Sequence, residues 1–490
     1  MTASDTHFDL IIVGAGLSGI CAAWHMRKAR PHARIALFEA RDDVGGTWDL
    51  FQYPGVRSDS DMPTLGFTFR PWIEEHAIAS GDRIKRYIRN TAEDGDILRH
   101  IRFGHRLRSA DWSSTAQRWS LRFRCRPDNA VANYSADFLM LCTGYYDYAA
   151  GYTPEFAGRE AFQGEWVHPQ QWPDTFSTKD KRIAVIGSGA TAVTLVPSLA
   201  ETAAHVTMVQ RTPSYIAEMP ARDAVSRWAH RWLGKRAAHW LTRWKNILYT
   251  MSVFQLSRRF PSFMRKQLVN KVRQRLGSAV DVDKHFNPPY DPWDQRLCLA
   301  PDGDFFDALS NGSASVATGN IASFGADHLS LDDGTRIDAD VIVCATGLAL
   351  RVAGGARISV DGERVQANER VTYKGAMLSG VPNFAMTMGY TNASWTLKCE
   401  LISQWTVRLL NYMDKHQYGV VCPLYLDHGA DRPFIDLRAG YIERAATILP
   451  RQSRARPWTV NQNYFLDLYA FKWSGINDRA LQFTRRISTA

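Results

Sequence analysis

Two glycine-rich segments have residue types and spacing suited to holding the pyrophosphate of a dinucleotide. The first is Gly14-Ala-Gly-Leu-Ser-Gly19 and the second is Gly187-Ser-Gly-Ala-Thr-Ala192. Glycine at these positions permits a tight turn, close approach of the backbone to phosphate, and close packing of the next helix on its strand. The free amide groups at the start of that helix attract the anion. The sequence therefore predicts two dinucleotide sites.

The residue that ends the second strand of each unit indicates which dinucleotide binds there. The strand predicted over 34–38 ends at Glu39, whose carboxylate accepts hydrogen bonds from a free ribose diol and repels a 2′-phosphate. The strand predicted over 205–210 ends at Arg211, which can pair with a 2′-phosphate. We therefore expect FAD at the first site and NADPH at the second, although Arg211 could instead be a surface arginine without a ligand. Candidate FAD contacts are Gly14, Gly16, Ser18, Gly19 and Glu39, and candidate NADP contacts are Gly187, Ser188, Gly189, Ala190, Thr191, Arg211 and Thr212.

The segment between the two glycine loops has a distinctive pattern of its own. It reads Phe162-Gln-Gly-Glu-Trp-Val-His-Pro-Gln-Gln-Trp-Pro173 and lacks a helical or strand period, which predicts a structured loop. Taken alone, His168 is most simply a hydrogen-bonded structural histidine, and Trp172 is a packing anchor. The spacing of Phe162, Gly164, His168, Trp172 and Pro173 resembles the fingerprint of the Baeyer–Villiger monooxygenases, flavoproteins that insert oxygen beside a ketone. The resemblance implies that this fingerprint transmits cofactor binding between domains.

Further segments resemble the same family and carry over candidate roles. Val44-Gly-Gly-Thr-Trp48 resembles its flavin-contacting segment, which implies FAD contacts at Gly46, Thr47 and Trp48. The resemblance also implies that Asp59 lies beside flavin and nicotinamide, that Arg57 binds NADP, and that Leu107 contacts the adenine half of FAD. Trp293-Asp-Gln-Arg296 resembles the segment with the catalytic arginine, and Gln295 replaces the lysine that many relatives have. The tail over 456–464 resembles the ethionamide-activating mycobacterial branch of the family.

The resemblance implies a specific reaction. NADPH reduces FAD, O2 then gives a C4a-peroxyflavin, and the Arg296 guanidinium stabilises the peroxide anion and its adduct with the carbonyl, while Asp59 orients Arg296. A ketone becomes an ester or lactone, and a sulfide or thioamide can be oxidised instead. The alternative is a flavin-containing N- or S-oxygenase without Baeyer–Villiger activity, whose fingerprint usually closes in tyrosine where this chain has Trp172. A non-enzymatic nucleotide- or membrane-binding protein is a further alternative.

These motifs require an α/β fold with two Rossmann-like dinucleotide-binding domains and a helical insertion in the NADP domain. We expect the FAD-binding domain in two parts, 1–146 and 348–490. The NADP-binding domain is also expected in two parts, 147–213 and 290–347, around an insertion at 214–289. A helix is predicted over 394–414, capped by Asn392 or Ser394.

Bulk composition narrows the class of protein further. The seven cysteines among 490 residues are scattered and form no Cys-x-x-Cys pair, which argues against a dithiol redox centre, a disulfide reductase or a metal site. No apolar run reaches the length of a transmembrane helix. These features predict a cytoplasmic enzyme, and the sequence leaves its oligomeric state open.

The net charge of +10 is concentrated in one region. Residues 221–276 contain fourteen Lys and Arg residues and one acid, Asp223. Tryptophans recur there at helical spacing, which predicts amphipathic helices with an apolar core stripe and a solvated basic face. The alternative is peripheral membrane contact through 214–289, since Trp with Arg and Lys suits an anionic interface. Nucleic-acid binding is disfavoured, because the two cofactor sites already account for the fold. The stripe consists of Trp228, Trp232, Trp240, Trp244 and Leu248.

Overall fold

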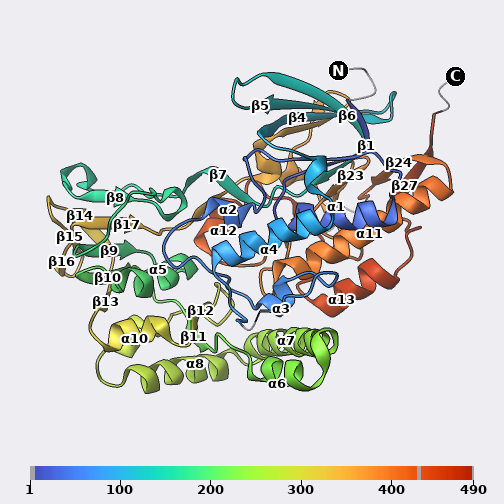
Figure 1. Cartoon of the computed structure of the whole chain (residues 1–490). Helices are drawn as coiled ribbons and strands as arrows, with labels where there is room; N and C mark the ends of the chain where they lie inside the picture. Colours follow the sequence, from blue (N-terminus) through green and yellow to red (C-terminus); the bar gives the residue numbers. More distant parts are fainter. Residues whose placement is uncertain (1–5, 75, 427–431, 488–490) are drawn as a thin grey trace.

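Two β-sheets organise the protein, which a computed structural model describes over residues 6–74, 76–426 and 432–487 (Figure 1). The first sheet has the strand order β20-β19-β4-β5-β6-β1-β2-β3, and β23 pairs with β6 beside that path. Strands β23, β6, β1, β2 and β3 run parallel, whereas β4 and β5 form an antiparallel extension. The strands are β1 (His7–Val13), β2 (Ile35–Phe38), β3 (Ile101–Arg102), β4 (His105–Ser113), β5 (Arg118–Cys125), β6 (Val131–Leu141), β19 (Arg357–Val360), β20 (Glu363–Arg364) and β23 (Phe384–Met386).

Both faces of the first sheet are buried at β1 and β2, which explains why β1 is apolar from Leu10 to Val13. Leu10 and Ile12 face a core shared with α1 (Leu17–Ala29), α4 (Gly81–Asp94) and α11 (Trp395–Lys415), whereas Ile11 and Val13 face a second core. The short helices α2 (Thr47–Leu50) and α3 (Met62–Leu65) lie in the loops before α4.

The second sheet is entirely parallel, in the order β13-β10-β9-β17-β8. Its alternating residues again face two cores, one shared with α5 and α10 and the other with a small antiparallel sheet. The elements are β8 (Glu165–Val167), β9 (Arg182–Ile186), α5 (Ala190–Ala200), β10 (His205–Gln210), α10 (Asp304–Ser310), β13 (Ala314–Thr318), β14 (Ile321–Phe324), β15 (His328–Leu331), β16 (Arg336–Asp338) and β17 (Val341–Cys344).

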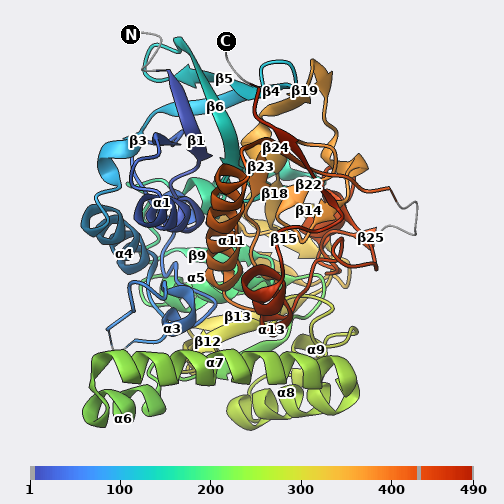
Figure 2. The same cartoon turned by 90° about the vertical axis from the view of Figure 1, so that its right-hand side faces the viewer.

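The chain passes between the two sheets twice (Figure 1), and the two connections pair with each other as strands β7 and β18. The insertion follows β10 and forms a layer of helices along one side of the molecule (Figures 1 and 2). The elements here are β7 (Tyr146–Gly151), β11 (Ile216–Met219), α6 (Ala224–Trp232), α7 (Gly234–Arg259), α8 (Pro261–Leu276), α9 (Val282–His285), β12 (Cys298–Pro301) and β18 (Leu348–Leu350).

The C-terminal part completes the first domain and brings α11 against α1 (Figure 2). A π-helical turn at Tyr469–Trp473 directly follows α13. The remaining elements are β21 (Thr372–Tyr373), β22 (Met377–Leu378), β24 (Tyr418–Pro423), β25 (Arg432–Pro433), α12 (Gly440–Arg444), β26 (Arg451–Gln452), α13 (Tyr464–Leu468) and β27 (Leu481–Arg485).

The predicted fold class is confirmed, and three local expectations are wrong. The fingerprint is not a loop throughout, because β8 joins the edge of the second sheet by pairing with β17. Ser394 is the N-terminal cap residue of α11 but makes no capping hydrogen bond; its hydroxyl lies 2.5 Å from that of Thr64. Asn392 instead donates to the carbonyl of Gln462. The tryptophan stripe of the insertion is not a core stripe, since Trp228, Trp232, Trp240 and Leu248 are exposed and only Trp244 packs inside.

Candidate active site

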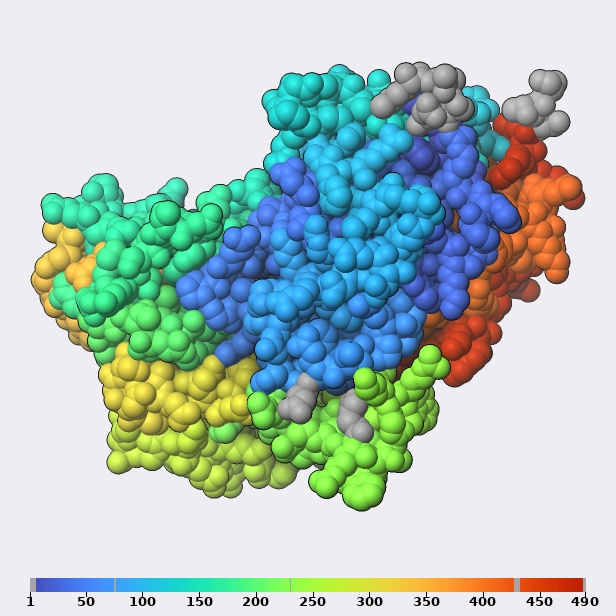
Figure 3. All heavy atoms as spheres, viewed as in Figure 1, coloured from blue at the N-terminus to red at the C-terminus, as the bar shows by residue number. Residues whose placement is uncertain are grey.

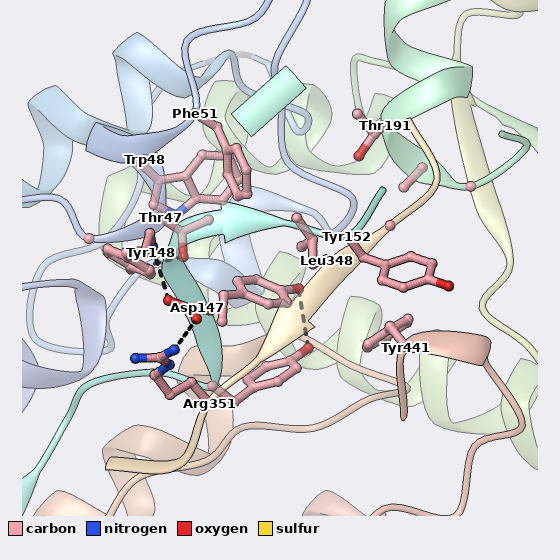
Figure 4. Close-up of a pocket in the computed structure, with 18 of the residues that line it drawn as sticks. Thr47, Trp48, Phe51, Asp147, Tyr148, Tyr152, Thr191, Leu348, Arg351 and Tyr441 are labelled. Atoms are coloured by element: carbon pink, nitrogen blue, oxygen red, sulfur yellow. Dashed lines mark hydrogen bonds and ion pairs between the residues drawn. The ribbon is translucent and has the colours of Figure 1, made fainter. Parts of the chain in front are cut away.

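A cavity of about 1170 Å³ lies where the two domains meet, and most of the candidate site residues line it. Every candidate FAD and NADP contact lines it except Gly19, and so do both candidate catalytic residues, Asp59 and Arg296. Thr47 and Trp48 of the first domain and Thr191 of the second face this space from different sides (Figure 4). The size of the cavity suits large ligands, because ordinary small-molecule pockets measure about 300–1,000 Å³.

The first glycine loop needs its glycines for steric reasons. Gly14 has φ +105°, and a Cβ there would lie 2.4 Å from the carbonyl oxygen of Cys142. A Cβ on Gly19 would lie 1.7 Å from the carbonyl oxygen of Gly14. The loop thus turns tightly against the end of β6 and leaves its backbone open to the cavity at Gly14 and Gly16. Gly19 serves the packing of α1 rather than lining the cavity.

Glu39 fixes this loop from the end of β2. One carboxylate oxygen accepts from the amide of Ala15 at 2.7 Å, and the other accepts from the amide of Arg41 at 2.9 Å. Burial raises the pKa of Glu39, and the two backbone donors act in the opposite direction. The carboxylate therefore joins the glycine loop to the strand end while it lines the cavity.

Replacing Glu39 by glutamine should loosen the first loop. Glutamine keeps one acceptor oxygen but turns an NH2 group toward an amide donor, and a hydrogen bond to a buried charged group contributes about 1.5–3 kcal/mol. We expect a lower free energy of unfolding and a reduced content of bound flavin in Glu39→Gln, measured by denaturant titration and by absorbance. Glu201→Gln, at an exposed residue after α5, is the matched control. Unchanged stability and flavin content in Glu39→Gln would contradict this account.

The second glycine loop follows β9 and repeats the geometry of the first, because it turns tightly against the end of β17. Gly187 has φ +131°, and a Cβ there would lie 2.3 Å from the carbonyl oxygen of Ala345. Ser188 donates to the carbonyl of Thr212 at 3.1 Å, which ties the loop to the end of β10. Arg211 is exposed where it lines the cavity and forms no ion pair with any residue in the described ranges. Its guanidinium is therefore available to an anionic ligand.

Arg296 and Asp59 form an ion pair inside the cavity, with 2.5 Å between Nη2 and Oδ2. Arg296 comes from the segment between α9 and β12, and Asp59 comes from the loop before α3. About a third of each side chain is accessible, 33% and 36% respectively, and both residues line the cavity. The carboxylate of Asp59 raises the pKa of Arg296 further above its ordinary value, so the guanidinium stays charged. The pair thus places a permanent cation in the cavity that both glycine loops line.

Three tyrosines that are not among the predicted site residues surround this ion pair. Tyr145 and Tyr146 follow β6, with 3.2 Å between their hydroxyl oxygens, and the ring of Tyr145 stacks on Trp395 at 5.2 Å. Tyr441 reaches the cavity from α12. Burial raises the pKa of each phenol while the charge of Arg296 opposes that rise, so all three stay protonated. A signal existed for the first pair, because Gly144-Tyr-Tyr follows a buried strand; no motif marks Tyr441.

Strand β7 holds a second ion pair at the cavity wall. Asp147 pairs with Arg351 at 2.7 Å between Oδ2 and Nη2, and Tyr148 on the same strand approaches Thr47 (Figure 4). The backbone carbonyl of Asp147 accepts from the side chain of Gln170 in the fingerprint. The cavity wall and the fingerprint are therefore joined through β7.

The fingerprint residues lie behind this wall, and none of them lines the cavity. His168 accepts from the amide of Gln170 through Nδ1, and its ring fills the space next to Gly151, where a Cβ would lie 1.9 Å from Cε1. Burial lowers the pKa of His168 and keeps the ring neutral. Phe162 and Trp172 pack against separate cores of the second domain, Gly164 lies against Asp340, and Pro173 accepts a turn hydrogen bond from Phe176. The signalling role implied by the family resemblance stays a prediction.

The segment 53–61 of the first domain contacts the second domain and the insertion through alternate residues. A Cβ on Gly55 would meet the backbone of Thr194 in α5, which shows how closely the two parts approach. Arg57 pairs with Asp304 of α10 through two hydrogen bonds. Two residues further on, Asp59 holds Arg296, and Asp61 accepts from Asn246 of α7 at 2.8 Å. Together these contacts fix Arg296 relative to the first domain.

Asn246→Ala should loosen this connection measurably. Asp61 is buried and its pKa is raised by that burial, so loss of the Asn246 donor leaves a carboxylate with fewer partners. We expect a loss of about 1–3 kcal/mol in the free energy of unfolding at neutral pH. The loss should shrink as pH falls toward the raised pKa of Asp61, because the folded state then binds a proton that the unfolded state does not. Denaturant titrations across pH, with Asn270→Ala on α8 as control, test this; a pH-independent loss contradicts it.

Among the described residues, no cluster of three or more His, Cys, Asp or Glu side chains could hold a metal ion. The seven cysteines are all free. No helix within the described ranges has the length and apolar character needed to span a bilayer.

Residues 9–353 match the family described as flavin-binding monooxygenase-like. The chain is 47% identical over 481 residues to the FAD-containing monooxygenase EthA of Mycolicibacterium smegmatis, covering 98% of this chain and 97% of that protein. It is 41% identical over 488 residues to the probable FAD-binding monooxygenase AlmA of Acinetobacter baylyi, with coverage of 99% and 98%.

Solved structures with the same fold include an oxidised steroid monooxygenase bound to NADP. It is 21% identical, with a TM-score of 0.74 and coverage of 98% of this chain and 100% of that chain. A structure of OTEMO in complex with FAD and NADP also has a TM-score of 0.74, with 20% identity and coverage of 97% and 99%. At this level of identity the structural likeness concerns the fold.

Proposed function

The chain belongs to the flavin-binding monooxygenase-like family, and we propose that it uses NADPH and O2 to convert ketones to esters or lactones. Its cofactors are FAD, held at the first glycine loop, and NADPH, held at the second. The observation that carries this proposal is the Arg296–Asp59 ion pair in a cavity lined by both loops.

The residues present fit both cofactors. Gly14 and Gly187 have no room for a side chain, because φ is positive and a carbonyl lies close, and both line the cavity with their backbone, where a pyrophosphate can bind. Glu39 supplies a carboxylate for a ribose diol, and Arg211, which pairs with no carboxylate in the described ranges, supplies a guanidinium for a 2′-phosphate. Trp48, Thr47 and Gly46 line the same cavity beside the first loop and are assigned to the flavin.

Bound flavin, once reduced by NADPH, supplies oxygen activated from O2. The task of Arg296 is then electrostatic: its fixed guanidinium stabilises the negative charge that develops on a ketone oxygen during attack. Asp59 holds the guanidinium in place and keeps it protonated. The protonated phenols of Tyr145, Tyr146 and Tyr441 can donate hydrogen bonds to the same charge, and their rings restrict the entry of water.

A second candidate activity is oxidation of sulfides or thioamides in the same cavity, favoured by the resemblance of the tail over 456–464 to the ethionamide-activating branch of the family. This reaction develops no negative charge on a substrate carbonyl, so it depends less on Arg296. The decisive experiment is to load the purified holoenzyme with matched ketones and sulfides in the presence of NADPH and O2 and to identify the products. Ester or lactone supports the first activity, sulfoxide alone supports the second, and NADPH oxidation without any oxygenated product contradicts both.

We also propose that residues 214–289 contact a membrane peripherally. The support is the exposure of Trp228, Trp232 and Trp240 on helices that contain no acidic residue.

A further inference from the structure

The outer side of α6 and α7 exposes large apolar side chains that no described element covers. Trp232 and Trp240 are 67% and 63% exposed, whereas tryptophan side chains in folded proteins are on average largely buried. Soluble proteins rarely expose a broad apolar area without using it for binding. Figure 3 shows residues of this region (green) along the lower edge of the molecule. We call this surface the insertion face; its members include Trp228, Trp232, Leu233, Trp240, Leu248 and Tyr249.

The apolar surface continues onto a distant part of the chain. Trp244 on α7 lies between Trp240 and Phe465, with ring centroids 6.1 Å and 6.2 Å away, and the Phe465 ring is stacked on it. Phe465 belongs to α13, which lies beside α7 (Figures 1 and 2). Leu466 on α13 and Trp473 in the following π-helical turn are also exposed, at 43% and 64%. Segments more than 200 residues apart in the sequence thus contribute to one surface.

The same helices carry several positive charges that no described residue neutralises. Neither α6 nor α7 contains an acidic residue. Arg231 lies over the ring of Trp232 and Arg259 over the ring of Phe260, so cation and aromatic groups are interleaved. Within the described ranges, the following exposed side chains of α6 and α7 form no ion pair: Arg227, Arg231, Lys235, Arg236 and Arg259.

We propose that the insertion face and α13 together form a docking surface for an anionic lipid bilayer. This inference rests on the membrane contact in the proposed function and adds the lipid charge and the C-terminal helix. Tryptophan and leucine enter the boundary between headgroups and acyl chains, while Lys and Arg bind the anionic headgroups. A second copy of the chain fits this surface poorly, because it would bring two clusters of unpaired cations together. Nucleic acid would leave the aliphatic side chains uncovered.

Flotation of the FAD-loaded protein with vesicles tests the proposal. Phosphatidylcholine vesicles with phosphatidylglycerol should bind it, and vesicles of phosphatidylcholine alone should bind it at least about tenfold more weakly. Arg231→Gln with Arg236→Gln should weaken anionic binding on the order of tenfold or more, since each cation near the surface contributes about 1 kcal/mol, a factor of about five. Arg118→Gln with Arg122→Gln, on exposed positions of β5 at the opposite side of the molecule, is the matched control.

The contribution of α13 is tested separately by Phe465→Ser with Leu466→Ser, with Val131→Ser as the exposed control. Weaker binding by the α13 variant supports the composite surface. If only the Arg231/Arg236 variant binds more weakly, the composite surface is wrong but membrane contact stands. If the unmodified protein binds neither vesicle, or self-associates without lipid and binds both vesicles equally, membrane docking is overturned. NADPH oxidation, measured on every variant, reports the proposed enzymatic activity independently of lipid binding.

Discussion

Arg296→Ala should lower the conversion of a ketone to its ester on the order of 10²–10³-fold or more, the usual effect of removing one group that stabilises a developing oxyanion. Flavin should remain bound, because Arg296 belongs to neither glycine loop and its ion-pair partner is Asp59. Flavin reduction by NADPH should persist, so the variant should release hydrogen peroxide in place of ester. The measurement is a parallel assay of ester, peroxide and NADPH consumption.

Two further variants show whether the loss of ester formation comes from the missing charge of Arg296 or from a disturbed structure of the segment around it. Arg296→Lys retains a cation and should restore part of the ester formation. Arg258→Ala removes a neighbouring ion pair with Asp294 that lies outside the cavity, so it should leave the ratio of ester to peroxide unchanged. If Arg296→Ala forms ester at the rate of the unmodified enzyme, Arg296 has no role in the oxygenation step.

Arg211→Ala should raise the KM for NADPH by about 10- to 100-fold and leave the KM for NADH nearly unchanged. The reason is the loss of a charge-assisted hydrogen bond, which contributes about 1.5–3 kcal/mol when its partner is a phosphate. In the proposed site the nicotinamide lies near Asp59 rather than Arg211, so kcat with saturating NADPH should change little. Stopped-flow flavin reduction with each nucleotide measures both parameters.

Lys179→Ala is the control for a general loss of positive charge, since Lys179 is an exposed cation of the same domain that does not line the cavity. Equal increases in KM for NADPH and NADH in Arg211→Ala would contradict a contact with the 2′-phosphate. They would instead indicate that Arg211 supports the shape of the loop.

The parts of the site that the sequence predicts are those in which a short run of neighbouring residues must have particular types, either to avoid a steric clash or to place a charge. Gly14 and Gly187 must be glycine because the structure leaves no space for a Cβ at either position. The close spacing of glycines in each loop makes this requirement visible in the sequence. Family resemblance predicts Arg296 and Asp59 from segments more than 200 residues apart, and the structure brings the two side chains together. The fold class followed from the same two strand–loop–helix units.

Other features depend on contacts that no local pattern encodes. Tyr441 reaches the cavity from a five-residue helix with no recognisable motif. Strand β8 is only three residues long, and it is a strand because β17 offers it a partner. The stripe over residues 228–248 has the period of a buried helix face, yet most of it is exposed. Periodicity shows that a helix has an apolar side, but it does not show what covers that side.

The most direct test of the account is the fate of isotopically labelled molecular oxygen in the unmodified enzyme supplied with NADPH and a simple ketone. A monooxygenase of the proposed kind will place one labelled atom in the ester or lactone, at a yield that matches NADPH consumption and depends on Arg296. Recovery of all label in hydrogen peroxide or water, with the ketone unchanged across a panel of ring and chain sizes, would contradict it.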